Sequence, residues 1–239
     1  MNFEIDPEWI RKSILEWYAA YGRRFPWRSE NLRDPYIILV TELLLQKTRA
    51  EIVESVWYHF FNKFPTIGDL ARATPEEIFE LIRGLGLKYR AKRLKIMAQQ
   101  IMHLFNGEIP SECKNLLKLT GVGPYVASAV ICFAYNKRKP IVDVNVMRVM
   151  NRFTGLTDEI SIRKFLDKVL PRKAFKQFNW GLLDLAQLIC KSNEPICAEC
   201  PLSAKCPKFE IRISEWRILR KYIRNGQVFL RLQKYASNR

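Results

Sequence analysis

Apolar side chains recur three or four residues apart along almost the whole chain, whereas stretches in which apolar and polar residues alternate are scarce. A repeat of about 3.6 residues places the apolar side chains on one face of a helix. The pattern therefore predicts an all-α protein. The predicted helices span residues 6–21, 35–47, 49–63, 75–83, 89–105, 111–118, 124–134, 143–153, 161–169 and 174–189.

The residues at two of the predicted helix starts support this assignment. Asp6 precedes Pro7 and Thr74 precedes Pro75, so each capping side chain stands directly before a proline at the first helical position. Glu77, three residues after Thr74, completes a capping box. Short helices joined by short loops, without an internal repeat, are typical of a compact helical bundle.

The chain carries a strong excess of positive charge. Its 40 Lys and Arg residues outnumber 24 Asp and Glu, which gives a formal net charge of +16 over 239 residues. Such a balance favours a polyanionic partner, since neutralised phosphates release counterions on binding. On charge alone this partner could be RNA, DNA or an anionic membrane. No run approaches the ~20 apolar residues of a membrane span and the N-terminus lacks a secretory layout, so we expect a protein of the cytoplasm or nucleoid.

Four of the six cysteines fall within 17 residues, in the order Cys-x6-Cys-x2-Cys-x5-Cys. In a protein of the cytoplasm such a cluster is better explained by metal ligands than by disulfides. The spacing suits a zinc ion as well as an iron–sulfur cluster. Cys113 and Cys132 stand apart, where we expect small buried hydrophobic side chains. The clustered residues are Cys190, Cys197, Cys200 and Cys206.

A tight turn between two apolar helices is predicted at Gly121-Val122-Gly123-Pro124. Two glycines allow the chain to bend sharply, and a proline suits the first position of the following helix. The exposed amides of such a turn, at the N-terminus of a helix, can bind a phosphate without reading the base sequence. Taken alone, the turn could equally be a plain helix connection.

Asp143 follows a short apolar stretch and opens the next predicted helix, in the run Val142-Asp143-Val144-Asn145. An ordinary N-cap would explain an acid at this place. A fixed carboxylate could also stabilise the positive charge that develops on a sugar when a base departs. The two roles are compatible.

The glycine turn, the helix start at Asp143 and the four-cysteine spacing occur together in an order that resembles one family. They resemble the helix-hairpin-helix DNA glycosylases of the endonuclease III and adenine-glycosylase branch, over residues 25–206. The resemblance implies two helical domains that flank an active-site cleft, a [4Fe-4S] cluster on the four cysteines, and a monomer that acts on double-stranded DNA with a mismatched or damaged base. The implied domains are a six-helix barrel at 29–135, with the hairpin at about 113–127, and a cluster domain at 1–28 and 136–206, followed by a basic extension at 207–239.

On this resemblance Asp143 matches the catalytic aspartate, and Tyr125 stands where the bifunctional endonuclease III enzymes have a lysine. A tyrosine offers no amine with which to form a Schiff base on the sugar. We therefore expect a monofunctional glycosylase in which water is the nucleophile. A tyrosine here is similar to the archaeal mismatch-specific thymine glycosylases and to some eukaryotic adenine glycosylases, and a core aromatic residue is the structural alternative.

Three further positions carry roles that the resemblance implies. Glu42 matches the acid that protonates the departing adenine; in a pyrimidine enzyme it would bind the base edge or position water, and a salt bridge is the alternative. Gln46 matches the side chain that fills the gap left by a flipped base, which offsets part of the few kcal/mol that flipping costs. Leu87 matches a second wedge, at which adenine enzymes usually have tyrosine. Contacts with DNA are also implied for Lys47, Arg90, Gly121, Val122, Gly123 and Asn145.

These residues together predict a mismatch glycosylase that removes thymine or uracil opposite guanine. Adenine removal opposite 8-oxoguanine or guanine is the first alternative, suggested by Glu42, although 207–239 is too short for the C-terminal domain that adenine enzymes usually carry. An endonuclease III-like enzyme for damaged pyrimidines would want a lysine at Tyr125. A non-catalytic DNA-binding module would not need Asp143 in its place.

The segment 207–239 differs in character from the rest of the chain. It holds nine Lys or Arg residues against two acids, with aromatic residues between them. An amphipathic terminal helix with a solvated basic face is the prediction for it.

Overall fold

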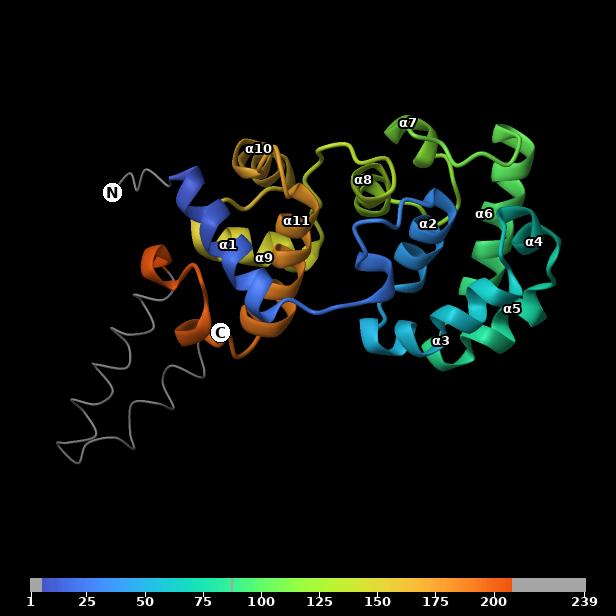
Figure 1. The fold of residues 1–239 in the computed structure, drawn as a ribbon, viewed down its shortest axis with the longest axis horizontal. Helices are drawn as coiled ribbons and strands as arrows, with labels where there is room; N and C mark the ends of the chain where they lie inside the picture. Colours follow the sequence, from blue (N-terminus) through green and yellow to red (C-terminus); the bar gives the residue numbers. More distant parts are fainter. Residues whose placement is uncertain (1–5, 87, 208–239) are drawn as a thin grey trace, which may run out of the picture.

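In the computed structural model, which describes residues 6–86 and 88–207, the chain folds into helices without any strand (Figure 1). The all-α prediction is therefore confirmed for this part of the chain. None of the described helices is long and apolar enough to cross a membrane. The terminal helix predicted over 207–239 and the wedge residue Leu87 lie outside the described residues.

The helices gather into two groups, which Figure 1 shows side by side. The chain passes between the groups twice, through residues 22–34, with a short turn at Pro26–Arg28, and through residues 134–143. The larger group contains α2 (Pro35–Leu44), α3 (Ala50–Lys63), α4 (Ile67–Arg72), α5 (Pro75–Ile82), α6 (Tyr89–Phe105), α7 (Cys113–Leu116) and α8 (Pro124–Phe133). The other contains α1 (Pro7–Tyr21), α9 (Val144–Thr154), α10 (Glu159–Val169) and α11 (Phe175–Asp184). The domain boundaries given above stay a prediction.

The larger group is built around α2 and α8, which pack against each other. Both helices are apolar on all sides, and nearly every side chain along them is buried. A helix of this kind can only be stable inside a protein, surrounded by other elements. The two buried polar side chains of α2, Thr41 and Glu42, are therefore exceptions that need partners.

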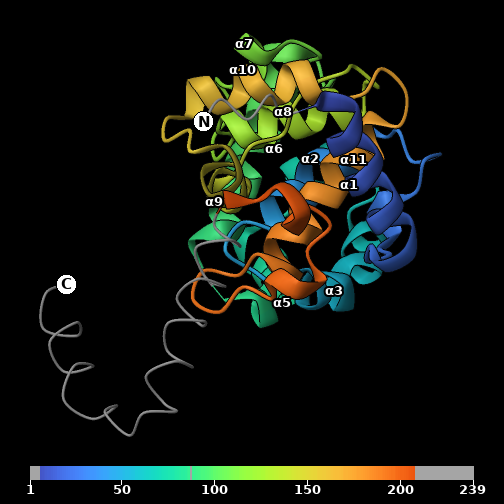
Figure 2. The ribbon, with the colours of Figure 1, turned by 90° about the vertical axis from the view of Figure 1, so that its left-hand side faces the viewer.

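The second group joins the two ends of the described chain. α1 packs against α10 and α11, and Figure 2 shows α1 lying over α11. After α11 the chain continues through a π-helical turn, Leu185–Ile189, and two short turns, Cys197–Glu199 and Ser203–Lys205, which contain or flank the clustered cysteines. The four-cysteine loop is therefore the last described part of this group.

The predicted helix starts are confirmed, but several boundaries differ. Asp6 accepts a hydrogen bond from the backbone N of Glu8 at 2.9 Å, and Thr74 and Glu77 form the expected capping box. The helix predicted over 35–47 ends at Leu44, and Lys47 adopts a left-handed conformation with a φ of 57°. The helices predicted over 111–118 and 174–189 are shorter, at Cys113–Leu116 and Phe175–Asp184.

One helix was not predicted from the sequence. α4 has only six residues, which is too short to show a helical repeat of apolar positions. Its start, however, carries a full capping box, in which Thr66 and Asp69 bond to each other's backbone N. The capping residues were thus the one local sign of this helix.

The close contact between α1 and α11 depends on Gly181. A Cβ atom at Gly181 would lie 2.8 Å from Cγ2 of Ile14 and 3.1 Å from Cβ of Tyr18. We expect Gly181→Ala to lower the free energy of unfolding by about 1–3 kcal/mol, because overpacking outweighs the better helix propensity of alanine. Urea denaturation measures this, with Gly84→Ala as the control, since nothing lies within 4 Å of a Cβ at Gly84. Equal stability of the two variants would contradict the packing described here.

Candidate active site

A cleft of about 770 Å³ is lined by residues from both groups of helices. Its walls come from the turn Pro26–Arg28, α2, the loop after α2, α8, the start of α9 and the end of α11. Residues far apart in the sequence are thereby brought to one place. The predicted site residues that line this cleft are Glu42, Gln46, Lys47, Gly123, Tyr125, Asp143 and Asn145.

Asp143 is the N-cap of α9, and its carboxylate is held in one orientation. Oδ1 accepts hydrogen bonds from the backbone N of Asn145 at 3.0 Å and of Val146 at 2.7 Å, while Oδ2 accepts from Nδ2 of Asn145 at 2.8 Å. The residue is half-buried at the cleft wall. The N-cap reading is therefore confirmed, and the same bonds fix a negative charge where a substrate would bind.

The bonds of Asn145 continue away from the cleft. Its Oδ1 accepts from Nη1 of Arg148 at 2.8 Å. The same guanidinium donates from Nε to the carbonyl of Cys190 at 3.0 Å and from Nη2 to that of Ala186 at 2.8 Å. A chain of hydrogen bonds thus connects the Asp143 carboxylate with the beginning of the four-cysteine loop.

Glu42 and Tyr125 face each other inside the cleft. Glu42 is only 5% exposed, and burial raises the pKa of its carboxyl from 4.5 to about 7, although a hydrogen bond with Tyr125 and the charge of Arg28 oppose the shift. One oxygen of the carboxyl, Oε2, is buried without a hydrogen-bond partner. Burial, then Glu42 and Asp143, raises the pKa of Tyr125 well above its usual value, so its hydroxyl remains a neutral donor.

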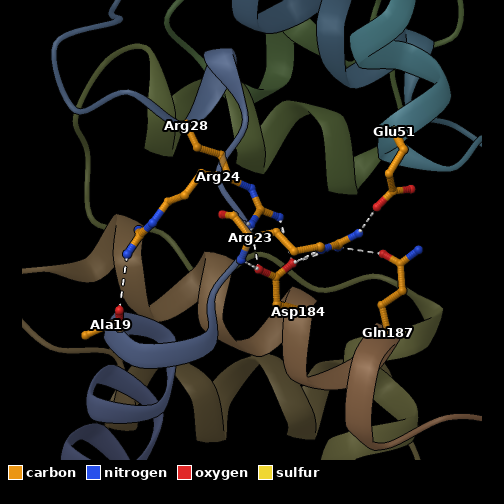
Figure 3. Close-up of polar contacts among 7 residues, drawn as sticks. All are labelled: Ala19, Arg23, Arg24, Arg28, Glu51, Asp184 and Gln187. Carbon is orange, nitrogen blue, oxygen red and sulfur yellow. Dashed lines mark hydrogen bonds and ion pairs between the residues drawn. The ribbon is translucent and has the colours of Figure 1, made fainter.

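A buried ionic network lies beside the cleft, and three of its members line it (Figure 3). Asp184, at the end of α11, is 0% exposed and accepts from Nε and Nη2 of Arg23 at 2.9 and 2.7 Å and from Nη1 and Nη2 of Arg28 at 2.7 and 3.0 Å. Arg23 also donates to Glu51 of α3 at 3.0 Å and to Gln187 at 2.7 Å. The network therefore bonds the two groups of helices to each other.

None of the members of this network was a candidate in the sequence analysis. Arg23, Arg28 and Gln187 line the cleft, and the positive charge of Arg28 lowers the pKa of Glu42. An acid at 184, inside the helix predicted over 174–189, was the available sign, since a buried charge requires a partner. The partners, about 160 residues earlier, could not be found from local sequence.

The loop after α2 is pinned from two sides. The side chain of Gln46 donates from Nε2 to the carbonyl of Gly121 in the glycine turn at 3.0 Å. From the other side Arg90 donates from Nη2 to the carbonyl of Gln46 at 2.6 Å and to Oγ1 of Thr48 at 3.0 Å. The predicted wedge and the predicted phosphate-binding turn are therefore in direct contact.

Within the glycine turn, the three predicted residues have different surroundings. Gly121 has a φ of 85°, a conformation that favours glycine, and Gly123 caps α8 directly before Pro124. The side chain of Val122 is buried in the core and its N–H donates to the carbonyl of Leu119. We therefore retain the two glycines as candidates for binding a phosphate and assign Val122 to the core. Arg90, 4% exposed, is likewise not an open surface cation.

The four clustered cysteines lie half-buried in one loop. Burial, with smaller effects from the other three thiols, raises the pKa of Cys200 to about 12. Arg152 of α9 holds the start of the loop, donating from Nη1 to Sγ of Cys190 at 3.4 Å and from Nη2 to the carbonyl of Ser192 at 2.7 Å. Across residues 6–86 and 88–207, however, no three Cys, His, Asp or Glu side chains are arranged closely enough to hold a metal ion.

Thiolates are suitable ligands for either metal considered above, so the chemistry of the donor set fits an iron–sulfur cluster or zinc. The four donors lie in one loop at the end of the described chain. The loop would have to draw its sulfur atoms together to form a complete site. The cysteines therefore suit a cluster in their residue type and in their place within one loop.

Comparison with known proteins identifies the family of the chain. Residues 40–172 match the model of the HhH-GPD superfamily base excision DNA repair proteins. This stretch contains Glu42, the glycine turn, Tyr125 and Asp143. The chain belongs to this superfamily. It is a DNA glycosylase of base excision repair, which confirms the prediction at this level.

Individual relatives cover most of the chain. A thymine-DNA glycosylase of Aeropyrum pernix is 37% identical over an alignment that covers 83% of this chain and 93% of the relative. An adenine DNA glycosylase of Mycolicibacterium smegmatis is 36% identical, over 80% of this chain and 66% of the relative. The solved structure of a thermostable thymine-DNA glycosylase superposes with a TM-score of 0.80 at 33% identity, over 86% of this chain and 97% of that one.

Because Glu42 has a raised pKa, it makes the stability of this glycosylase depend on pH. Between pH 4.5 and about 7 the unfolded chain loses the Glu42 proton while the folded protein keeps it, so stability falls as the pH rises through this window. In Glu42→Gln this contribution is absent. We expect the stability of the wild type relative to Glu42→Gln to fall by up to about 1.4 kcal/mol per pH unit within the window, measured by urea denaturation. A constant difference would show that Glu42 is ionised in the folded protein.

Proposed function

We propose that this glycosylase removes thymine or uracil opposite guanine from double-stranded DNA and does not itself cut the strand. The observation that carries the proposal is that Tyr125, with a neutral hydroxyl, lines the same cleft as Glu42 and Asp143, at the place where a strand-cutting enzyme of the family would need a lysine amine. Similarity to the thymine-DNA glycosylase of A. pernix supports the choice of base.

In the reaction, the bond between C1′ of the sugar and the base is replaced by a bond between C1′ and the oxygen of water. As the bond between the base and C1′ breaks, its electron pair leaves with the base and positive charge develops on the sugar, which the fixed carboxylate of Asp143 stabilises. Water adds its oxygen to C1′, and its proton passes to an acceptor while the departing base gains one. Glu42, with a pKa of about 7, is suited to accept and return such a proton near neutral pH.

The remaining candidates would bind the DNA around the flipped nucleotide. Gln46 would fill the gap in the base stack, with Leu87 as the second wedge. The amides around Gly121 and Gly123, at the start of α8, would hold a phosphate, and Asn145, beside Asp143, would contact the same strand. Lys47, exposed on the loop after α2, would meet the backbone. The chain would act as a monomer.

Removal of adenine is the second candidate function. With a pKa of about 7, the buried carboxyl is protonated in about half of the molecules near neutral pH and can donate this proton to a departing purine. The M. smegmatis relative, which is nearly as similar as the A. pernix one, is an adenine DNA glycosylase. The choice between the two functions therefore depends on the base that the cleft accepts.

The base repertoire is tested by single-turnover excision on duplexes with T·G, U·G, A·G and A·8-oxoguanine pairs, each analysed with and without alkali. We expect loss of T or U, with nicks only after alkali, and a fall of at least about a hundredfold in Asp143→Asn. Excision of adenine would transfer the assignment to the second candidate. Nicks without alkali would contradict the role given to Tyr125.

We also propose that Cys190, Cys197, Cys200 and Cys206 hold a [4Fe-4S] cluster. Such a cluster would supply a structural element that joins the end of the described chain to α9, through the bonds of Arg148 and Arg152. It would have no part in breaking the glycosidic bond.

Metal analysis of the full-length protein, purified without oxygen, tests this assignment. We expect about four iron and four sulfide per chain, and loss of both in Cys200→Ser. Cys132→Ser is the control, because Cys132 is buried on α8, away from the loop. Zinc in place of iron, with no sulfide, would instead indicate a tetrahedral zinc site.

A further inference from the structure

Arg90 is an unusual charge in this fold. It is 4% exposed, and burial lowers the pKa of its guanidinium. Nη2 bonds to Gln46 and Thr48, but Nη1 is buried without a hydrogen-bond partner. Among the residues that the structure describes, no carboxylate forms an ion pair with it, in contrast to Arg28, which shares Asp184.

An unpaired buried charge destabilises the folded protein, even after the surroundings have relaxed. Proteins retain such a group when something else supplies the opposite charge or when the group acts on a ligand. Within the described residues the opposite charge is missing. A ligand that brings negative charge to this place would therefore be bound more tightly because Arg90 is there.

A small pocket lies beside Arg90. Its volume is about 90 Å³, far below the about 770 Å³ of the cleft. Lys47 and Arg93, both exposed, belong to its lining, together with Gly121 of the glycine turn, and no acidic residue does. The pocket is next to the start of α6, whose N-terminus has no side-chain cap.

We propose that this pocket binds one phosphate of the DNA backbone, with Lys47 and Arg93 in contact with the phosphate and the buried guanidinium of Arg90 as the fixed charge behind it. The inference rests on DNA being the substrate, as in the proposed function, but not on which base is removed. It adds a second phosphate site to the one expected at the amides of the glycine turn. A helix N-terminus and three cations together provide the charge that a phosphate requires.

The position of Arg90 gives the site a second effect. The same guanidinium holds the carbonyl of Gln46, and the Gln46 side chain reaches the carbonyl of Gly121. Lys47, which follows Gln46, has a left-handed conformation, which is unfavourable for a residue with a side chain. A phosphate in the pocket would stabilise this loop conformation, and thereby the wedge, only when the protein is on DNA.

The salt dependence of DNA binding tests the proposal. Binding is measured at several salt concentrations on a duplex with an uncleavable abasic-site analogue, so that neither turnover nor the identity of the base enters. Each phosphate contact contributes about 0.9 to the slope of log K against log salt concentration. We expect Arg93→Met to reduce the slope by about one contact, whereas Lys92→Met, which removes an exposed charge of the same helix that does not line the pocket, leaves it close to that of the wild type.

Two substitutions of Arg90 separate its charge from its hydrogen bonds. Arg90→Met should fold, reduce the slope, and show a smaller rise in Tm on adding the duplex than the wild type does. Arg90→Lys keeps the charge and should retain most of the slope. Equal slopes for Arg93→Met, Arg90→Met and the wild type would overturn the proposal, and so would a loss in Lys92→Met as large as that in Arg93→Met. Failure of the excision assay alone would leave these binding results unaffected.

Discussion

The active site depends on the ion pairs that the carboxylate of Asp184 forms with Arg23 and Arg28. The carboxylate lies beyond the reach of solvent and receives the guanidinium groups of these two arginines from the segment that leads from one group of helices to the other. A buried ion pair contributes little net stability, but removing one partner is costly because a charge is left uncompensated. Its value here is geometric, since the bidentate pair with Arg28 and the two bonds from Arg23 to one oxygen of the carboxylate fix the connecting segment against the end of α11.

The consequence of this geometry is felt at Glu42. That residue comes from α2 in the larger group, whereas Asp143 comes from the start of α9 in the other. The charge of Arg28 lowers the pKa of Glu42 while that of Asp143 raises it. A change in the relation of the two groups would alter both effects at once. The acid–base properties of the cleft are therefore a property of the assembled fold and not of any single helix.

The sequence was sufficient for features that are local in the chain. The all-α class, the capping box of Thr74 and Glu77 and the N-cap role of Asp143 depend on residues no more than four positions apart. The same holds for the glycine turn, in which two adjacent requirements, a left-handed residue and a helix start at Pro124, fall on suitable residue types. The resemblance to a family then placed Glu42 and Tyr125 in one site, which the helical periodicity alone could not have done.

What the sequence could not reveal was contact between distant segments. The partners of Asp184 and the contact of Gln46 with Gly121 depend on how the two groups of helices and their loops pack. Arg90 illustrates the limit well, because a basic residue at the start of a helix is usually exposed, and here its side chain turns inward beneath the loop after α2. The end of the first long helix in the larger group, at Leu44, was misplaced because the left-handed Lys47 has no sequence mark such as a glycine.

The packing of α1 on α11 has an implication for how the protein is made. The helix Pro7–Tyr21 is synthesised well before its main partner, Phe175–Asp184, so it must wait while roughly 160 further residues are added. At about 5–20 residues per second this delay is on the order of 10–30 s. The helices from α2 to α8 are contiguous in the sequence and can assemble during that interval. Translation itself would then impose an order of folding in which the cleft is completed last.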